Sequence, residues 1–280
     1  MIQPQLDTPP VAPAAPVLSS LARYQQSFAE DGFLVWRGVI SRERLAQLQR
    51  QLVDEYAAAR ASGRLFNGGG NLAGHLNCSP GEAARFVYDT LVSAGIIDVI
   101  KAISGKVTRL PNVGCNFNLP GSVTQHWHMD RPFMRDFMIA NVAVVDTNLE
   151  NGAINVLPGS HRRYYPYWQL ALERASMRLM SRRVPLQQGD VLVRTSSLWH
   201  RGMPNNTAVA RPMLAFTWED GGTVHPDPFQ VDGGRIVFRP NWYQPNLLGR
   251  LRERTYLAAP LTHDAYRIAR SLIGTKGYDH

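Results

Sequence analysis

The stretch Gln125-His126-Trp127-His128-Met129-Asp130 decides which fold and chemistry the chain is expected to have. It follows a strand-like run, Cys115 to Asn118, and a turn at Pro120-Gly121. Within it, His128 and Asp130 are two metal-ligand side chains separated by one residue. On a strand, residues i and i+2 point to the same face. The stretch therefore predicts two ligands of one metal ion, and the third ligand has to come from elsewhere in the chain.

Composition is that of an ordinary globular protein. The chain has 280 residues, of which 44% are hydrophobic and 19% charged, and it is long enough to bury a sizeable core. No apolar run reaches about 18 residues, so we expect no membrane-spanning helix. Residues 1–17 are rich in Pro and Ala, lack the pattern of a signal peptide, and are expected to form a flexible tail before one domain at 18–280. Cys78 and Cys115 are expected to be free thiols in the cytoplasm.

The net charge of +8 favours an anionic partner. The arginines are scattered along the chain, and no basic block with interleaved aromatic residues occurs, so nucleic-acid binding is not expected. We expect instead a small-molecule substrate, anionic or attached to a carrier. The oligomeric state, monomer or homodimer, is left open by the sequence.

Hydrophobic periodicity changes near residue 106. Before it, helical patterns cover 18–30, 41–60 and 79–104. After it, short β-branched and aromatic runs alternate with Gly, Pro and Asn, and they predict strands at 107–118, 123–130, 137–148, 152–157, 184–186, 190–195 and 210–218. Helical patterns return at 167–180, 245–257 and 262–273. The order predicts a mainly β protein with packed helices, an antiparallel sandwich or barrel carrying an N-terminal helical layer.

Two later segments resemble the motifs of a known family. Asn151-Gly152 is followed by Leu157-Pro158-Gly159-Ser160-His161, and Gly189-Asp190 by Trp199-His200-Arg201-Gly202, with Arg211 downstream. Together with His128-Met129-Asp130, and in this order, they resemble the phytanoyl-CoA dioxygenase family of Fe(II)/2-oxoglutarate-dependent oxygenases over roughly residues 25–220. The resemblance implies a double-stranded β-helix core, the cupin-like jelly roll.

The resemblance also implies the principal site residues. His128, Asp130 and His200 match the metal ligands, and Arg211 matches the arginine that pairs with the far carboxylate of 2-oxoglutarate. Two histidines and one carboxylate on one face of an ion leave positions open for 2-oxoglutarate and O₂. The guanidinium fork of an arginine can bond both oxygens of a carboxylate.

Other polar residues are candidates for contacts with the cosubstrate. One or more of Gln125, Asn116, Asn118 and Asn141, which lie on neighbouring predicted strands, are expected to contact 2-oxoglutarate, although a solvent-facing position explains each of them equally well. His126 shares the face of His128 by parity. The family pattern and the need for a carboxylate favour Asp130 as the second ligand, and His126 is then expected to line the pocket or to form a hydrogen bond with the cosubstrate.

The glycine-rich segment 63–78 is a candidate lid, with an ordinary surface loop as the alternative. In the lid interpretation His75 and Asn71 would face the substrate. Arg131, one residue after the ligand Asp130, could meet an anionic group.

The expected activity is hydroxylation of an unactivated C–H bond with release of succinate and CO₂. The resemblance disfavours halogenation, because halogenases on related folds lack the carboxylate that Asp130 supplies. Desaturation, cyclisation or epimerisation by the same iron centre are alternatives within the class. A cupin-like metal isomerase that needs no 2-oxoglutarate, and a non-catalytic ligand-binding protein, are alternatives of other classes.

Overall fold

The structure is a computed structural model that describes residues 20–65, 72–105, 107, 110–130, 133, 136–173, 176, 179–219, 227–239 and 246–273. The predicted tail, Asn71 and Arg131 lie outside the described residues. Among the helices of the described ranges, none is long and apolar enough to cross a membrane.

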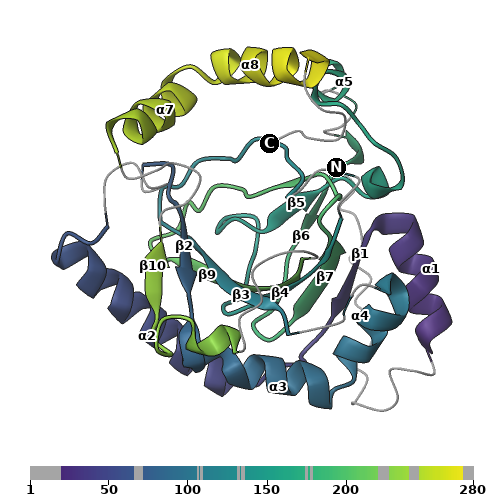
Figure 1. Cartoon of the computed structure of the whole chain (residues 1–280), viewed down its shortest axis with the longest axis vertical. Coiled ribbons are helices and arrows are strands. Elements are labelled where there is room, and N and C mark those ends of the chain that lie inside the picture. Colours follow the sequence, from purple (N-terminus) through teal and green to yellow (C-terminus); the bar gives the residue numbers. More distant parts are fainter. Residues whose placement is uncertain are drawn as a thin grey trace, which may run out of the picture.

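Two antiparallel sheets form the centre of the molecule (Figure 1). The larger has the order β1-β7-β4-β9-β3-β2-β10 and the smaller the order β6-β5-β8. The strands are β1 (Phe33–Trp36), β2 (His75–Ser79), β3 (Asn112–Asn118), β4 (Met138–Ala143), β5 (Ile154–Val156), β6 (Arg182–Val184), β7 (Val191–Thr195), β8 (His200–Arg201), β9 (Arg211–Trp218) and β10 (Val237–Arg239). All strand pairs are antiparallel.

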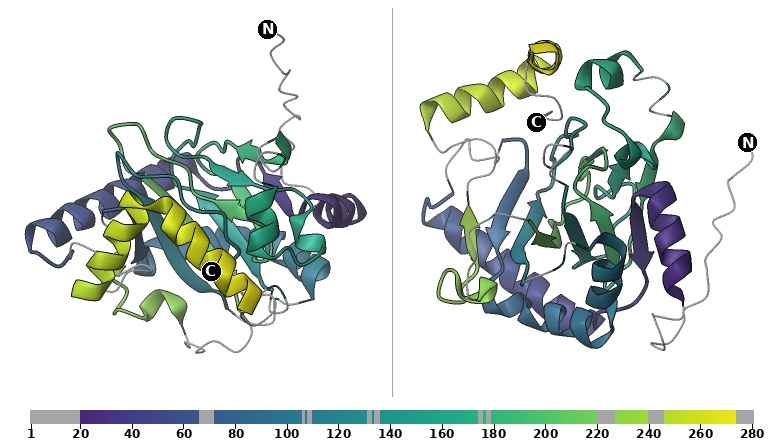
Figure 2. Two further views of the ribbon diagram at one scale, coloured as in Figure 1. Left: turned by 90° about the horizontal axis from the view of Figure 1, so that it is seen from above. Right: turned by 45° about the vertical axis from the view of Figure 1, so that its right-hand side comes forward.

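Helices cover the outside of the large sheet and leave its inner face to the small one (Figures 1 and 2). The helices are α1 (Leu21–Asp31), α2 (Arg42–Ala61), α3 (Arg85–Ser93), α4 (Ile96–Ser104), α5 (Tyr167–Leu172), α7 (Leu247–Ala258) and α8 (Pro260–Ile273). Leu45, Leu48 and Leu52 of α2 share one core with the sheet residues Phe117 and Phe216. The N-terminal helical layer and the jelly-roll class are therefore as predicted.

Strand β4 shows why the central strands read as continuous apolar runs. It lies between β7 and β9, and all six of its residues are buried. A strand covered on both faces cannot alternate polar and apolar residues. The cavity described below opens between the two sheets, and polar side chains of the central strands, including Asn141 of β4, Arg194 of β7 and Thr217 of β9, line it.

Some predicted elements, such as the strand at 107–118, are shorter in the structure, and three others differ in kind or are divided. The single helix expected at 79–104 is divided into a 3-10 turn at Gly81–Ala84, α3 and α4, because Gly95 adopts a left-handed φ of 70° between the helices. The segment expected to be a loop up to residue 78 ends instead in strand β2, which pairs with β3. The expected strand 123–130 is not a regular strand, and within the described part of the chain it makes one isolated bridge, between His128 and His200.

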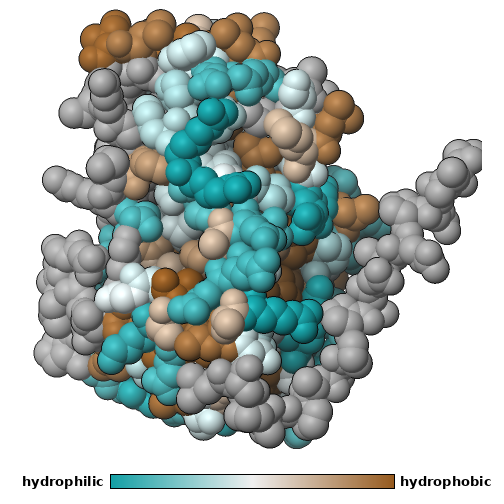
Figure 3. Space-filling model, turned by 90° about the vertical axis from the view of Figure 1, so that its right-hand side faces the viewer, coloured by the Kyte–Doolittle hydropathy of each residue, from teal (hydrophilic) through white to brown (hydrophobic). Residues whose placement is uncertain are grey.

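The C-terminal helices lie on the opposite side of the molecule from α2 and α3, and α8 packs beside α5 (Figures 1 and 2). Helix α8 turns polar residues inward, since Asp264 is 7% and Arg267 3% exposed. Its outer face is apolar, with Leu261 77% and Ile273 87% exposed. The space-filling view shows this apolar surface at the end of the molecule where α8 and α5 lie (Figure 3). Polar contacts therefore contribute much of what holds α8 in place.

Candidate metal and cosubstrate site

The three predicted metal ligands converge at one point between the sheets. The backbones of His128 and His200 are bonded to each other in both directions, at 3.0 Å for each N to O distance. The Asp130 Oδ1 lies 3.5 Å from Nε2 of His200 and 3.9 Å from Nε2 of His128. Ligand atoms of all three residues lie within 4.8 Å of one another. One ion can therefore reach all three side chains.

The hydrogen bonds of the two histidines leave the correct nitrogen for a metal. Nδ1 of His128 lies 2.9 Å from the His126 carbonyl oxygen, and Nδ1 of His200 lies 2.9 Å from that of Leu198. A carbonyl oxygen only accepts, so Nδ1 of each ring donates its proton and Nε2 keeps a lone pair. Burial lowers the pKa of both histidines, which keeps the rings neutral. The residues present thus fit a divalent metal ion.

Asp130 is held as a carboxylate by a buried arginine. Burial opposes its charge, but Arg194, whose Nη1 donates to Oδ2 at 2.6 Å, brings the pKa of Asp130 well below its usual range. Arg194 also donates through Nε to Oδ1 of Asn141 at 3.2 Å. Arg194 was not among the predicted site residues. A signal was present, because an arginine inside the apolar strand Val191–Thr195 needs a buried anion.

Arg211 opens β9 and points into the same cavity. It is 6% exposed, and Nη2 donates to the Gly152 carbonyl at 3.3 Å. Nε is buried with no hydrogen-bond partner among the described residues. Burial lowers the pKa of Arg211 to about 10. A buried guanidinium with an unmatched donor is suited to a carboxylate that arrives from solution.

Two motif glycines are explained by this geometry. Gly152 has a φ of 91°, and a Cβ there would lie 2.6 Å from the Met203 carbonyl oxygen. Gly202 donates through its backbone N to Oε1 of Gln125 at 2.7 Å, and a Cβ at Gly202 would collide with that oxygen. Both positions admit only glycine without displacement.

The cavity has a volume of about 330 Å³, within the range of small-molecule sites. Besides the metal ligands and Arg211, its lining includes the predicted residues Gln125, Asn116, Asn141 and His75. His75 belongs to β2 rather than to a loop, and its Nε2 lies 2.6 Å from the Val123 carbonyl oxygen. Burial is the main reason that the pKa of His75 is lowered to about 4. Asn118, another of the predicted candidates, also lines the cavity, as do Arg194 and Glu219, which were not among the predicted site residues.

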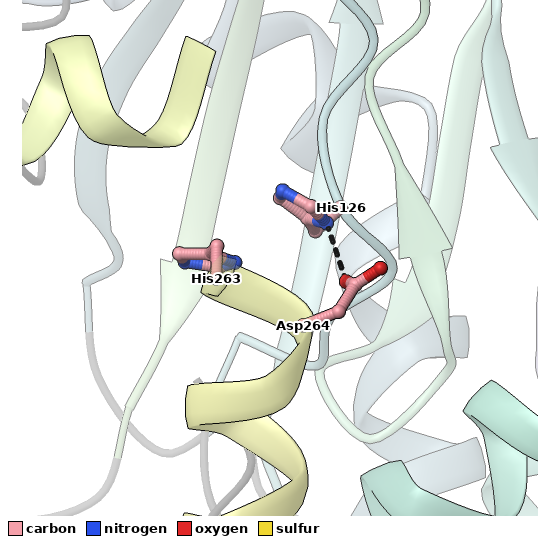
Figure 4. Close-up of side chains that lie close together, drawn as sticks. All are labelled: His126, His263 and Asp264. Carbon is pink, nitrogen blue, oxygen red and sulfur yellow. Dashed lines mark ion pairs between the residues drawn. The ribbon is translucent and has the colours of Figure 1, made fainter. Parts of the chain in front are cut away.

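His126 is not among the residues that line this cavity. Its ring stacks on His263 of α8, with 4.3 Å between ring centroids, and its Nδ1 lies 3.3 Å from Oδ1 of Asp264 (Figure 4). The parity argument for His126 was wrong because 123–130 is not a regular strand.

The fold and site define a jelly-roll protein with two histidines, one carboxylate and a buried arginine around a common cavity. The chain matches the family described as Phytanoyl-CoA dioxygenase (PhyH) over residues 28–213, a range that includes these four residues. The chain belongs to this family, as the motifs predicted.

Similar proteins agree with this assignment. The chain is 28% identical over 150 residues to "Dioxygenase lolE1" of Epichloe uncinata, covering 51% of this chain and 56% of the relative. It is 35% identical over 79 residues, 26% of this chain and 28% of the relative, to a "Probable alpha-ketoglutarate-dependent hypophosphite dioxygenase" of Stutzerimonas stutzeri. The chain thus spans about half or less of the length of these curated relatives.

A solved structure shares the fold. The epimerase SnoN in complex with Fe3+, alpha ketoglutarate and nogalamycin RO superposes with a TM-score of 0.52 at 22% identity, covering 72% of this chain and 84% of that one.

Proposed function

We propose that the protein is a non-haem Fe(II)/2-oxoglutarate-dependent dioxygenase that hydroxylates an unactivated C–H bond of a small molecule. The observation that carries the proposal is the convergence of His128, Asp130 and His200 beside a buried arginine with an unmatched donor, Arg211. The overall reaction converts 2-oxoglutarate, O₂ and R–H to succinate, CO₂ and R–OH.

Each residue has a definite part in this proposal. The two Nε2 atoms and the Asp130 carboxylate would hold Fe(II) on one side, leaving the other side of the ion to 2-oxoglutarate and O₂. When bound, the iron supplies the oxidising power that breaks the C–H bond. Arg211 binds the far carboxylate of 2-oxoglutarate and so fixes its orientation. Gln125, which is bonded to the Gly202 backbone, holds the segments that carry His128 and His200 together.

We infer that the substrate is anionic. Arg194 lines the cavity in addition to the Arg211 that is assigned to 2-oxoglutarate. Toward Asp130 and Asn141, Arg194 donates through Nη1 and Nε, which leaves Nη2 for a ligand. The net charge of +8 acts in the same direction by attracting anions to the molecule. We further propose that the chain works in the cytoplasm, where the buried free thiols Cys78 and Cys115, which face each other across β2 and β3, would stay reduced.

An anaerobic titration with Fe(II) and 2-oxoglutarate tests the activity class. We expect a weak visible charge-transfer band in the wild type and its loss in His200→Ala. His161→Gln is the matched control, because His161 belongs to neither group of potential metal ligands among the described residues. Absence of the band in the wild type, or its persistence in His200→Ala, would contradict the proposal.

Product analysis separates hydroxylation from desaturation, cyclisation and epimerisation. Succinate formed in step with turnover excludes a cupin-like isomerase and a non-catalytic binding protein.

A further inference from the structure

A second group of metal-ligand side chains lies outside the cavity. It consists of His126, from the segment that carries the first site, and His263 and Asp264 from the first turns of α8 (Figure 4). We propose that these three residues form a second divalent-metal site, which fastens α8 to the segment bearing His128 and Asp130. This proposal does not depend on the activity proposed above.

The distances suit a transition-metal ion. One ligand atom from each residue lies within 4.8 Å of the others, and Nδ1 of His126 is 3.3 Å from Oδ1 of Asp264. Zinc binds histidine nitrogen and carboxylate oxygen at about 2.0–2.2 Å in a tetrahedron, which places neighbouring ligand atoms roughly 3.3 Å apart. Two imidazoles and one carboxylate are a ligand set for Zn²⁺ or Co²⁺, with a water in the fourth position.

The surroundings of the group support a ligand there. Nδ1 of His263 is buried without a hydrogen-bond partner among the described residues, and such a group costs free energy unless something binds it. Tyr167 donates to Oδ1 of Asp264 at 2.6 Å. A supporting hydrogen bond of this kind is typical of carboxylates that ligate metals, because it fixes their orientation.

The cationic side chain next to this group, Arg267, is held by other partners. Arg267 donates through Nη1 to the Trp127 carbonyl oxygen at 2.7 Å, and its guanidinium lies 3.9 Å from the centre of the Tyr167 ring. Asp264 supplies the negative charge that the ion requires.

The inverted polarity of α8 gives the ion a role. This helix faces the protein with Asp264 and Arg267, Ile268 is only partly buried against the core, and Leu261 and Ile273 are exposed, so polar contacts supply much of its docking. A metal joining it to His126 would add to these contacts. The rings of His126 and His263 are inclined by only 25°, so metal binding turns the His263 ring until its nitrogen points at the ion.

Metal stoichiometry tests the proposal without any assay of activity. The variant His128→Ala/His200→Ala removes the first site and leaves the Asp130–Arg194 ion pair intact. After the metal is stripped and the protein dialysed against Co²⁺, we expect about one Co²⁺ per chain in this variant and about two in the wild type.

Adding His263→Gln or Asp264→Asn to that variant should abolish the remaining Co²⁺, whereas adding His161→Gln should not. Co²⁺ should also raise the Tm of the first variant and leave the Tm of the Asp264→Asn form unchanged. The proposal is overturned if the first variant binds no Co²⁺, or if its Co²⁺ survives both substitutions in α8.

Discussion

Replacing Arg211 by Met should weaken 2-oxoglutarate binding by about two to three orders of magnitude. Burial lowers the pKa of this guanidinium to about 10, and the side chain is only 6% exposed. The charged side chain is therefore destabilised in the free cavity, by roughly 3 kcal/mol when one pH unit counts for about 1.36 kcal/mol. A carboxylate that pairs with Arg211 can recover that free energy, which corresponds to roughly 100- to 1000-fold in Kd. The value lies within the ~2–5 kcal/mol observed when one partner of a buried ion pair is truncated.

The assay is an anaerobic titration of the Fe(II)-loaded protein with 2-oxoglutarate, followed by the charge-transfer band. Arg211→Lys should recover part of the affinity, because it restores the charge without the two-pronged geometry. Arg182→Met is the matched control, since it makes the same change of net charge at an exposed pair with Asp31. A Kd for Arg211→Met within about threefold of the wild type would refute the reasoning.

Three further predictions concern stability and metal affinity. Burial lowers the pKa of His75 from 6.5 to about 4, so the histidine is protonated in the unfolded state at a higher pH than in the folded state. The free energy of unfolding should therefore fall by up to about 3 kcal/mol between pH 6.5 and pH 4. Urea unfolding measured at both pH values should show this decrease in the wild type, and His75→Gln should lack the part of it that comes from His75. Arg194→Met should reduce Fe(II) affinity about 10- to 100-fold, measured by metal competition, because it removes the partner that orients Asp130; an unchanged affinity would show that Arg194 does not support the ligand. Trp218→Ala, at a side chain 1% exposed, should lower the free energy of unfolding by about 3–5 kcal/mol, whereas Leu172→Ala, at a side chain 78% exposed, should change it by less than about 0.5 kcal/mol.

The residues whose place in the cavity could be predicted from the sequence are those whose position depends on spacing between near neighbours in the chain. His128 and Asp130 are held by one pattern of spacing, and His200 and Arg211 flank a short connection between two strands. Such patterns can be recognised because the backbone that they require is local. The apolar runs of the central strands were recognisable for the same reason.

The features that the sequence analysis missed depend on contacts distant in the chain. Strand β2, with the polar sequence His-Leu-Asn-Cys-Ser, has weak β propensity and forms because it pairs with β3 on one side and β10 on the other. His126 was placed in the cavity by strand parity, which fails because the segment 123–130 makes a single bridge to the described residues, at His128. Its partners on α8 lie more than 130 residues away, and no local pattern connects them.

The two buried arginines of the cavity differ in charge balance, and this difference indicates which one receives the cosubstrate. Arg194 lies 2.6 Å from the Asp130 carboxylate, so its charge is already compensated within the protein. Arg211 has only the neutral Gly152 carbonyl as a described hydrogen-bond acceptor, and burial depresses its pKa. An incoming carboxylate therefore gains most at Arg211, because there it meets an uncompensated cation. A second anion would meet the remaining Nη2 of Arg194, which lies close to the metal ligands. An anionic group of the substrate bound there would hold the carbon to be oxidised near the metal. The anionic part of the substrate and the far carboxylate of 2-oxoglutarate therefore bind to different arginines, and Arg194→Met should raise the KM for substrate more than the KM for 2-oxoglutarate.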